Sequence, residues 1–329
     1  MDKLSLVTVI YEAEYPLAAL QARSMSRFLP PDLVHRIILV DNSYRAMPKA
    51  WASEILSEYG AMRDRVLVMR SIDVCELPLT SDWRKQQILK LVISRLIETR
   101  LYVALDAKNH FVWPAEPTFF RTEDGRPCVN AYSFEAHPSR PNLERVLRYL
   151  GVDPAGYVNR FTATVTPFTF VTAWVRQLVS ELGQGSTARF AQQFATAELT
   201  EFFLYAGWLV RDGHDLSEAF AIHQRFCPCI WPASVAEADV QTKVAAAEKN
   251  RAPIFSAHRN ALRAMPPPSQ ARLVDFWVAR GLFGSVPEAH TFLDRFRDNY
   301  AQQSRMLFIR SLPYEVSRLP RRIVRRLMR

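Results

Sequence analysis

Short apolar runs alternate with amphipathic stretches along the first third of the chain. The runs cover residues 4–10, 36–40, 65–69 and 101–106. A run of this length, apolar at nearly every position, is typical of a strand buried on both faces. Between the runs, apolar residues recur at helical spacing over 15–28, 48–59 and 82–98. Strands that alternate with such helices predict an α/β fold of the Rossmann-like kind, with a mostly parallel sheet flanked by helices.

The alternation weakens after Pro114, although further elements are predicted. The pattern favours strands over 128–134 and 253–256, and helices over 142–150, 172–182, 195–210, 270–280 and 287–299. We expect three parts: a sheet domain over 1–262, a helical annex over 263–312, and a basic amphipathic tail over 313–329.

The net charge of +9 is concentrated at the end of the chain. Residues 305–329 contain eight arginines and one acid, Glu315, which gives +7 and leaves only +2 for the other 304 residues. A nucleic-acid-binding domain needs basic groups spread over a folded face, so we expect no nucleic-acid partner.

The tail places Val316, Leu319, Ile323 and Leu327 on one helical face, with arginines on the others. A basic amphipathic segment suits an anionic membrane surface, and a disordered solubilising tail fits the sequence equally. Four cysteines are too few for a disulfide framework in 329 residues, and the N-terminal apolar run is too short for a signal peptide. We therefore expect a cytoplasmic protein, with a peripheral membrane contact as the further hypothesis.

The strand over 101–106 ends in polar side chains: Asp106, Lys108, Asn109 and His110. Open α/β sheets bind ligands at the carboxyl ends of their strands, which makes this the candidate site. An ordinary turn capped by Asp and Asn is the alternative. The turn after the first strand lacks glycine, so a dinucleotide-binding enzyme is not expected.

The helix predicted over 82–98 carries Trp83, Arg84, Gln87 and Lys90 near its start. A helix N-terminus favours anions, and the two cations strengthen that preference. A solvated polar helix face is the alternative.

These two segments together resemble a bacterial family of GT-A-type glycosyltransferases. The resemblance lies in Trp83, the pair Gln86 and Gln87, and Lys90, followed by the strand and turn over 102–108. Residues 166–168 and 200–205 match later parts of the family pattern, and the resemblance covers about residues 4–260.

The resemblance implies transfer of a sugar from a nucleotide-activated donor, and we expect a UDP-sugar. In the broad fold, two acids at this strand end hold Mg²⁺ or Mn²⁺ against the donor diphosphate. Here Lys108 stands where the second acid belongs. Either Asp106, Asn109 and His258 hold a metal, or the Lys108 ammonium supplies the positive charge in a metal-independent enzyme.

The resemblance also suggests roles for other residues. Tyr11, Glu12 and Asp41 would bind the nucleoside. Arg84, Gln87 and Lys90 would contact donor phosphate or sugar, beside Asp106. Glu201 would be the general base that deprotonates the acceptor hydroxyl. If the reaction retains configuration, Glu201 binds the acceptor without that role. A carboxylate stabilised by its helix dipole is the structural alternative.

The function that follows is sugar transfer to a polysaccharide or glycolipid acceptor in the synthesis of a bacterial envelope or capsule. Because Lys108 replaces an acid, a second hypothesis is an inactive relative that binds a glycan or acts as a scaffold.

Overall fold

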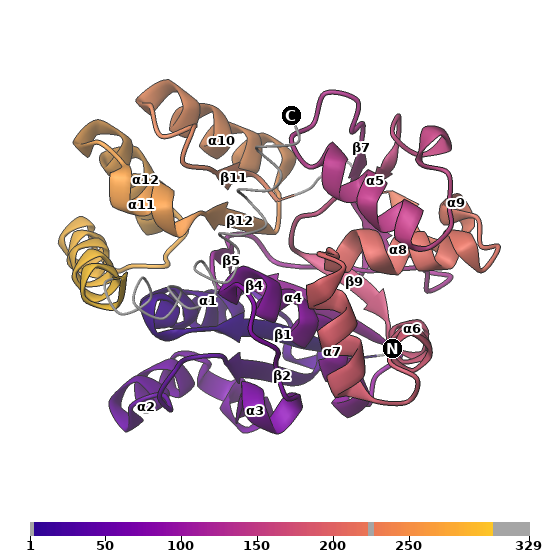
Figure 1. Ribbon diagram of the computed structural model, residues 1–329. Helices are drawn as coiled ribbons and strands as arrows, with labels where there is room; N and C mark the ends of the chain where they lie inside the picture. The colour runs from indigo at the N-terminus through magenta and orange to yellow at the C-terminus, as the bar shows by residue number, and fades with distance from the viewer. Residues whose placement is uncertain (1–2, 223–226, 305–329) are drawn as a thin grey trace, which may run out of the picture.

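The computed structural model describes residues 3–222 and 227–304, and its centre is a five-stranded sheet (Figure 1). The strand order is β3-β2-β1-β4-β9. Four strands run parallel, and β9 is antiparallel to β4. The bounds are β1 (Leu4–Ile10), β2 (Val34–Asp41), β3 (Val66–Arg70), β4 (Leu101–Asp106) and β9 (Phe168–Val171). The fold is α/β with a mostly parallel sheet flanked by helices, as the sequence predicts.

Both faces of the sheet are buried, which explains why its strands are apolar at successive positions. In β4, Leu101, Val103 and Leu105 pack into one core. Tyr102 and Ala104 pack into a second core on the opposite face.

The two cores are covered by different helices (Figure 1). The first core lies under α1 (Tyr15–Phe28), α2 (Lys49–Glu58), α10 (Glu237–Asn250), α11 (Arg259–Ala264) and α12 (Pro267–Ala279). The second lies under α4 (Asp82–Val92), α5 (Arg140–Tyr149), α6 (Thr172–Leu182), α7 (Thr187–Thr196) and α8 (Glu201–Arg211). Residues 286–304 are also helical.

Smaller elements connect these layers. A three-stranded sheet, ordered β11-β12-β5, continues directly from the tip of β4. Its strands are β5 (Asn109–Phe111), β11 (Cys229–Ile230) and β12 (Ile254–Ala257). The remaining strands and α-helices are α3 (Ser71–Val74), β6 (Cys128–Val129), β7 (Ala131–Tyr132), β8 (Phe161–Thr162), α9 (Leu216–Ala219) and β10 (Ala221–Ile222). The 3-10 helices are η1 (Glu12–Glu14), η2 (Pro31–Leu33), η3 (Gly60–Arg65), η4 (Ile93–Leu96), η5 (Pro117–Phe119) and η6 (Pro154–Gly156).

Three predicted elements differ clearly from the structure, and the 14-residue helix α10 was not predicted. The helix predicted over 82–98 is α-helical only to Val92 and continues as η4. The helix predicted over 195–210 begins at Glu201, because Glu198 takes a left-handed conformation (φ 54°) just after α7. The strand predicted over 128–134 is two short strands, since β6 pairs with β10 and β7 pairs with β8.

The predicted annex packs on the same core as the sheet. Trp277 of α12 and Phe296 join the cluster that contains Leu6 of β1. The predicted tail over 313–329 lies outside the described residues. Within 3–222 and 227–304, no helix combines the length and apolar character needed to cross a membrane.

Candidate active site

Asp106 is the last residue of β4, and its carboxylate is held by two lysines. The Lys90 ammonium donates to Oδ1 at 2.6 Å, and the Lys108 ammonium contacts Oδ2. The Thr166 hydroxyl also donates to Oδ2, at 3.0 Å. Burial alone would raise the pKa of Asp106, but the ammoniums of Lys108 and Lys90 lower it well below its ordinary range. Asp106 is therefore a fixed anion at neutral pH.

Lys90 links Asp106 to a second carboxylate, that of Glu201. Lys90 lies on α4, whose start is capped by the Ser81 hydroxyl, and Glu201 is the first residue of α8. The Lys90 ammonium lies 3.6 Å from Glu201 Oε1, and both side chains are buried. Burial raises the pKa of Glu201 to about 6, against the opposing effect of Lys90. Glu201 thus titrates just below neutral pH, as a general base requires.

The turn that carries Lys108 is braced by amide side chains. Asn109 Oδ1 accepts from the Asp106 backbone N–H at 2.7 Å, and Asn109 Nδ2 donates to the Ser256 hydroxyl at 2.6 Å. Gln21 Nε2 donates to the backbone carbonyls of Asp106 and Asn109 at 2.8 and 2.9 Å. These bonds fix the turn between α1 and β12.

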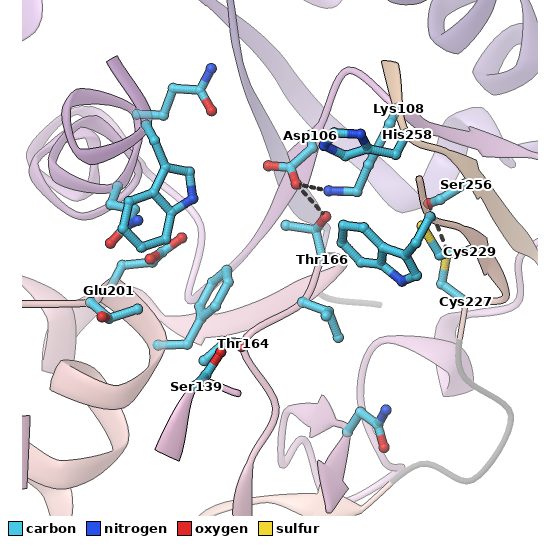
Figure 2. A pocket seen from close by; sticks show the side chains of 18 of the residues that line it. Asp106, Lys108, Ser139, Thr164, Thr166, Glu201, Cys227, Cys229, Ser256 and His258 are labelled. Carbon is cyan, nitrogen blue, oxygen red and sulfur yellow. Dashed lines mark hydrogen bonds and ion pairs between the residues drawn. The ribbon is translucent and has the colours of Figure 1, made fainter. Parts of the chain in front are cut away.

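A cavity of about 620 Å³ opens above this turn. Asp106, Lys108 and Glu201 all line it, which brings together the acid, the ammonium and the base predicted from the sequence. Figure 2 shows Glu201 and His258 on opposite sides of Asp106. The volume lies within the range of about 300–1,000 Å³ found for small-molecule sites.

The side of the cavity beyond Lys108 is aromatic and sulfur-rich. The Lys108 ammonium lies 5.4 Å from the Trp231 ring centroid, and the Trp231 and His258 rings are 5.4 Å apart. Cys227 and Cys229 line the same side (Figure 2). Burial raises the pKa of both thiols to about 12, so they are protonated and unreactive at neutral pH.

The residues predicted to bind Mg²⁺ or Mn²⁺ do not fit that role. Both Asp106 oxygens are occupied by ammoniums, and the Asn109 amide is committed to the turn. His258 Nδ1 accepts from the Asn260 backbone N–H at 3.2 Å. Across 3–222 and 227–304, no group of three or more histidines, cysteines or acids could hold a metal ion.

Comparison with known proteins places the chain in a family. A family model described as a family of unknown function, DUF6492, matches residues 4–262. The chain belongs to DUF6492. No curated protein matches this DUF6492 chain.

Several solved structures similar to this DUF6492 member are glycosyltransferases. An active-site mutant of LgtC aligns with a TM-score of 0.52 at 11% identity, covering 88% of this chain and 100% of that one. The galactosyltransferase LgtC in complex with donor and acceptor sugar analogs gives 0.51 at 10% identity, covering 87% and 98%. Mouse xyloside xylosyltransferase 1 gives only 0.42 at 14% identity, covering 79% and 99%. At these identities, the LgtC matches show a shared GT-A fold.

Three residues predicted to bind the nucleoside in this DUF6492 protein, Tyr11, Glu12 and Asp41, do not line the cavity. Asp41 ends β2, two strands from Asp106, and its carboxylate accepts from the backbone N–H groups of Ser43 and Met47, both at 3.0 Å. In η1, residues two apart point in different directions, so Glu14 lines the cavity and Glu12 does not. The predicted nucleoside contacts are not supported by this geometry.

Arg84 is also placed differently from the prediction. It does not line the cavity. Its guanidinium donates to the Leu199 carbonyl, which ties α4 to the loop before α8. Gln87 and Lys90, three and six residues further along α4, do line the cavity.

Several lining residues of this DUF6492 site were missed in the sequence. Trp231 follows β11, which at two residues is too short to give a strand pattern. Lys243 lies on α10, a helix that was not predicted from the sequence. Arg259 lines the cavity and pairs with Glu14 at 2.8 Å. Of these residues, only Glu14 could have been found from the sequence, because an acid within a segment predicted to be buried needs a partner.

Proposed function

We propose that this protein is a glycosyltransferase that moves a sugar from a nucleotide-sugar donor to a glycan or glycolipid acceptor. The observation that carries the proposal is the cavity above Asp106, which places a charged cluster at the carboxyl edge of the sheet. In open α/β sheets, this edge is where ligands bind. The GT-A fold shared with LgtC supports the same conclusion, since LgtC is a galactosyltransferase whose structure holds donor and acceptor sugar analogs.

In the proposed reaction, the bond between the anomeric carbon and the diphosphate oxygen breaks. An acceptor hydroxyl oxygen forms the new bond to that carbon, and its proton passes to Glu201. The nucleoside diphosphate leaves with the bonding electron pair. The ammoniums beside Asp106 stabilise the negative charge that develops on the departing diphosphate. If configuration is retained, Glu201 binds the acceptor hydroxyl instead.

The wall near Glu201 suits a sugar acceptor. Trp83 lines the cavity and is 53% exposed, which leaves an indole face for the apolar side of a sugar ring. Gln86, Ser139 and Asn142 line the cavity with neutral polar groups that can bind hydroxyls. Gln87 also lines it, is 1% exposed, and has no hydrogen-bond partner for either amide atom among the described residues.

A polysaccharide or glycolipid of a bacterial envelope or capsule is the acceptor that we propose, and a UDP-sugar is the donor. Envelope glycans are assembled at a membrane, and the basic sequence of residues 313–329 suits contact with its anionic surface.

A panel of nucleotide sugars tests the proposal. The full-length protein is incubated with UDP-, GDP- and CMP-sugars, with and without Mn²⁺, and nucleotide release is measured. We expect release from one nucleotide class, and loss of release in Glu201→Gln. A protein that neither cleaves nor binds any of these compounds is not a glycosyltransferase. The hypothesis of an inactive glycan-binding or scaffold protein would then replace it.

A further inference from the structure

Replacing the second acid by Lys108 raises the charge of the site by two units. That is the same charge that a bound Mg²⁺ or Mn²⁺ would add. Two aspartates at positions 106 and 108 would carry −2, which a divalent cation neutralises. Asp106 with Lys108 is already neutral. The adjoining pair of Lys90 and Glu201 is neutral as well when both are ionised. The cluster therefore has no charge deficit that a resident metal would fill.

The geometry also leaves no space for a metal ion at the Asp106 carboxylate. Each Asp106 oxygen already faces an ammonium, and a metal ion there would have to displace one of them. Mg²⁺ demands near-octahedral oxygen coordination at about 2.1 Å. The one other oxygen donor predicted, Asn109, is fully buried and committed to the turn.

We propose that Lys108 binds the donor diphosphate directly, in place of a metal ion. Lys90 positions Lys108 through Asp106, to which both lysines are paired. This inference rests on the proposed function. Asp106 is then an internal counter-ion and not a metal ligand. It holds the two ammoniums in a fixed arrangement, so no reorganisation is needed when the phosphates arrive.

Burial assigns different roles to the two lysines. The Lys108 side chain is 14% exposed and lines the cavity, so its ammonium can touch a phosphate oxygen. The Lys90 side chain is 5% exposed and lies between two carboxylates. Lys90 is therefore a positioning residue, and Lys108 is the contact residue.

The rest of the wall is consistent with an anionic ligand. Its charged residues are Lys90, Lys108, Lys243, Arg259, Glu14, Asp106 and Glu201, four cations against three acids. Lys243 makes no ion pair with any described residue. A nucleotide-sugar diphosphate carries two negative charges, so it is attracted to a wall of net charge +1 without a metal.

Calorimetric titration of the full-length protein with UDP and GDP, in EDTA and in Mn²⁺, tests this site. We expect one nucleotide to bind with the same affinity, within about twofold, in both media. Lys108→Gln should weaken binding by about 10- to 100-fold, the loss of one charged hydrogen bond. Lys108→Arg should keep most of the affinity. Lys249→Gln, on the exposed end of α10, is the matched control and should bind normally.

The outcomes separate this inference from the proposed function. Binding that requires Mn²⁺ would contradict the lysine site but not glycosyl transfer. Normal binding by a folded Lys108→Gln variant would do the same. Circular dichroism melting establishes that each variant is folded. If neither nucleotide nor inorganic pyrophosphate binds in either medium, the proposed function fails, and this site fails with it.

Discussion

Glu201 is a carboxylate whose environment sets its chemistry. Burial raises its pKa to about 6 and Lys90 opposes that rise, so at pH 7.5 most of the molecules carry a base that can accept a proton. We expect transfer activity to rise as the pH increases through about 6, and to be lost below it as Glu201 becomes protonated. Glu201→Gln should lower kcat by about 10²- to 10⁴-fold. Steady-state kinetics across pH 5–8 measure both effects.

Glu218→Gln, an exposed acid on α9, is the matched control for this measurement. It should keep the wild-type pH profile. A Glu201→Gln variant that retains wild-type kcat would show that Glu201 takes no proton from the acceptor.

The sequence identifies residues better when they share an element than when they meet through the fold. Asp106 and Lys108 are two apart on one turn, and Lys90 belongs to the helix just before that strand, so their proximity could be predicted. Trp231 could not, because it reaches the cavity from a two-residue strand more than 120 positions later. Asp41 was predicted to lie in the site but does not. It also ends a strand, β2, but β1 lies between β2 and β4.

At the scale of elements, β5 and α12 are joined by one buried hydrogen bond. Trp277 Nε1 donates to His110 Nε2 at 2.9 Å, and both side chains are buried. Trp277→Phe keeps an aromatic side chain but removes one ring of the indole and its N–H donor, leaving the imidazole nitrogen unpaired. We expect a loss of about 1–3 kcal/mol in the free energy of unfolding, measured by urea denaturation at pH 7.5.

The burial of His110 predicts a pH dependence of stability. Burial lowers the pKa of His110 to about 4, so the folded state keeps it neutral while the unfolded state protonates it below about 6.5. Stability therefore falls as the pH drops from 6.5 towards 4. His258, whose pKa burial also lowers to about 4, contributes to the same slope. His110→Phe should therefore make this part of the curve shallower, and His214→Phe, at an exposed position, should not. An unchanged slope in His110→Phe would assign the effect to other groups.

Hydrophobic periodicity predicted α1 and α6 with the bounds that they have, residues 15–28 and 172–182. It did not predict α10, which is as long as α1. Periodicity also failed where the backbone conformation determines the ends of an element. The break between α7 and α8 depends on the left-handed Glu198, which no apolar pattern records. The short strands β6, β7 and β8 depend on partners distant in sequence, which periodicity cannot supply.

At the scale of the molecule, the sheet and the predicted annex share one core. The boundary predicted at residue 263 therefore separates stretches of sequence that pack together. The predicted tail is a separate matter, because its basic residues suggest a function at a membrane surface.

Removal of residues 313–329 tests the membrane hypothesis. We expect the full chain to sediment with vesicles containing anionic lipid, and the truncated chain to remain in the supernatant. The reason is that the truncation removes six arginines, each worth about 1 kcal/mol at an anionic surface. Neutral vesicles are the control. Equal sedimentation of both chains with anionic vesicles would end the anchoring hypothesis.

The most direct test of the central claim is a crystal structure of the protein soaked with the nucleotide that it binds. We expect the diphosphate in the cavity above the tip of β4, with a phosphate oxygen within hydrogen-bonding distance of Lys108 Nζ and no metal between them. A nucleotide bound elsewhere on the protein, or a metal ion bridging Asp106 and the diphosphate, would contradict it.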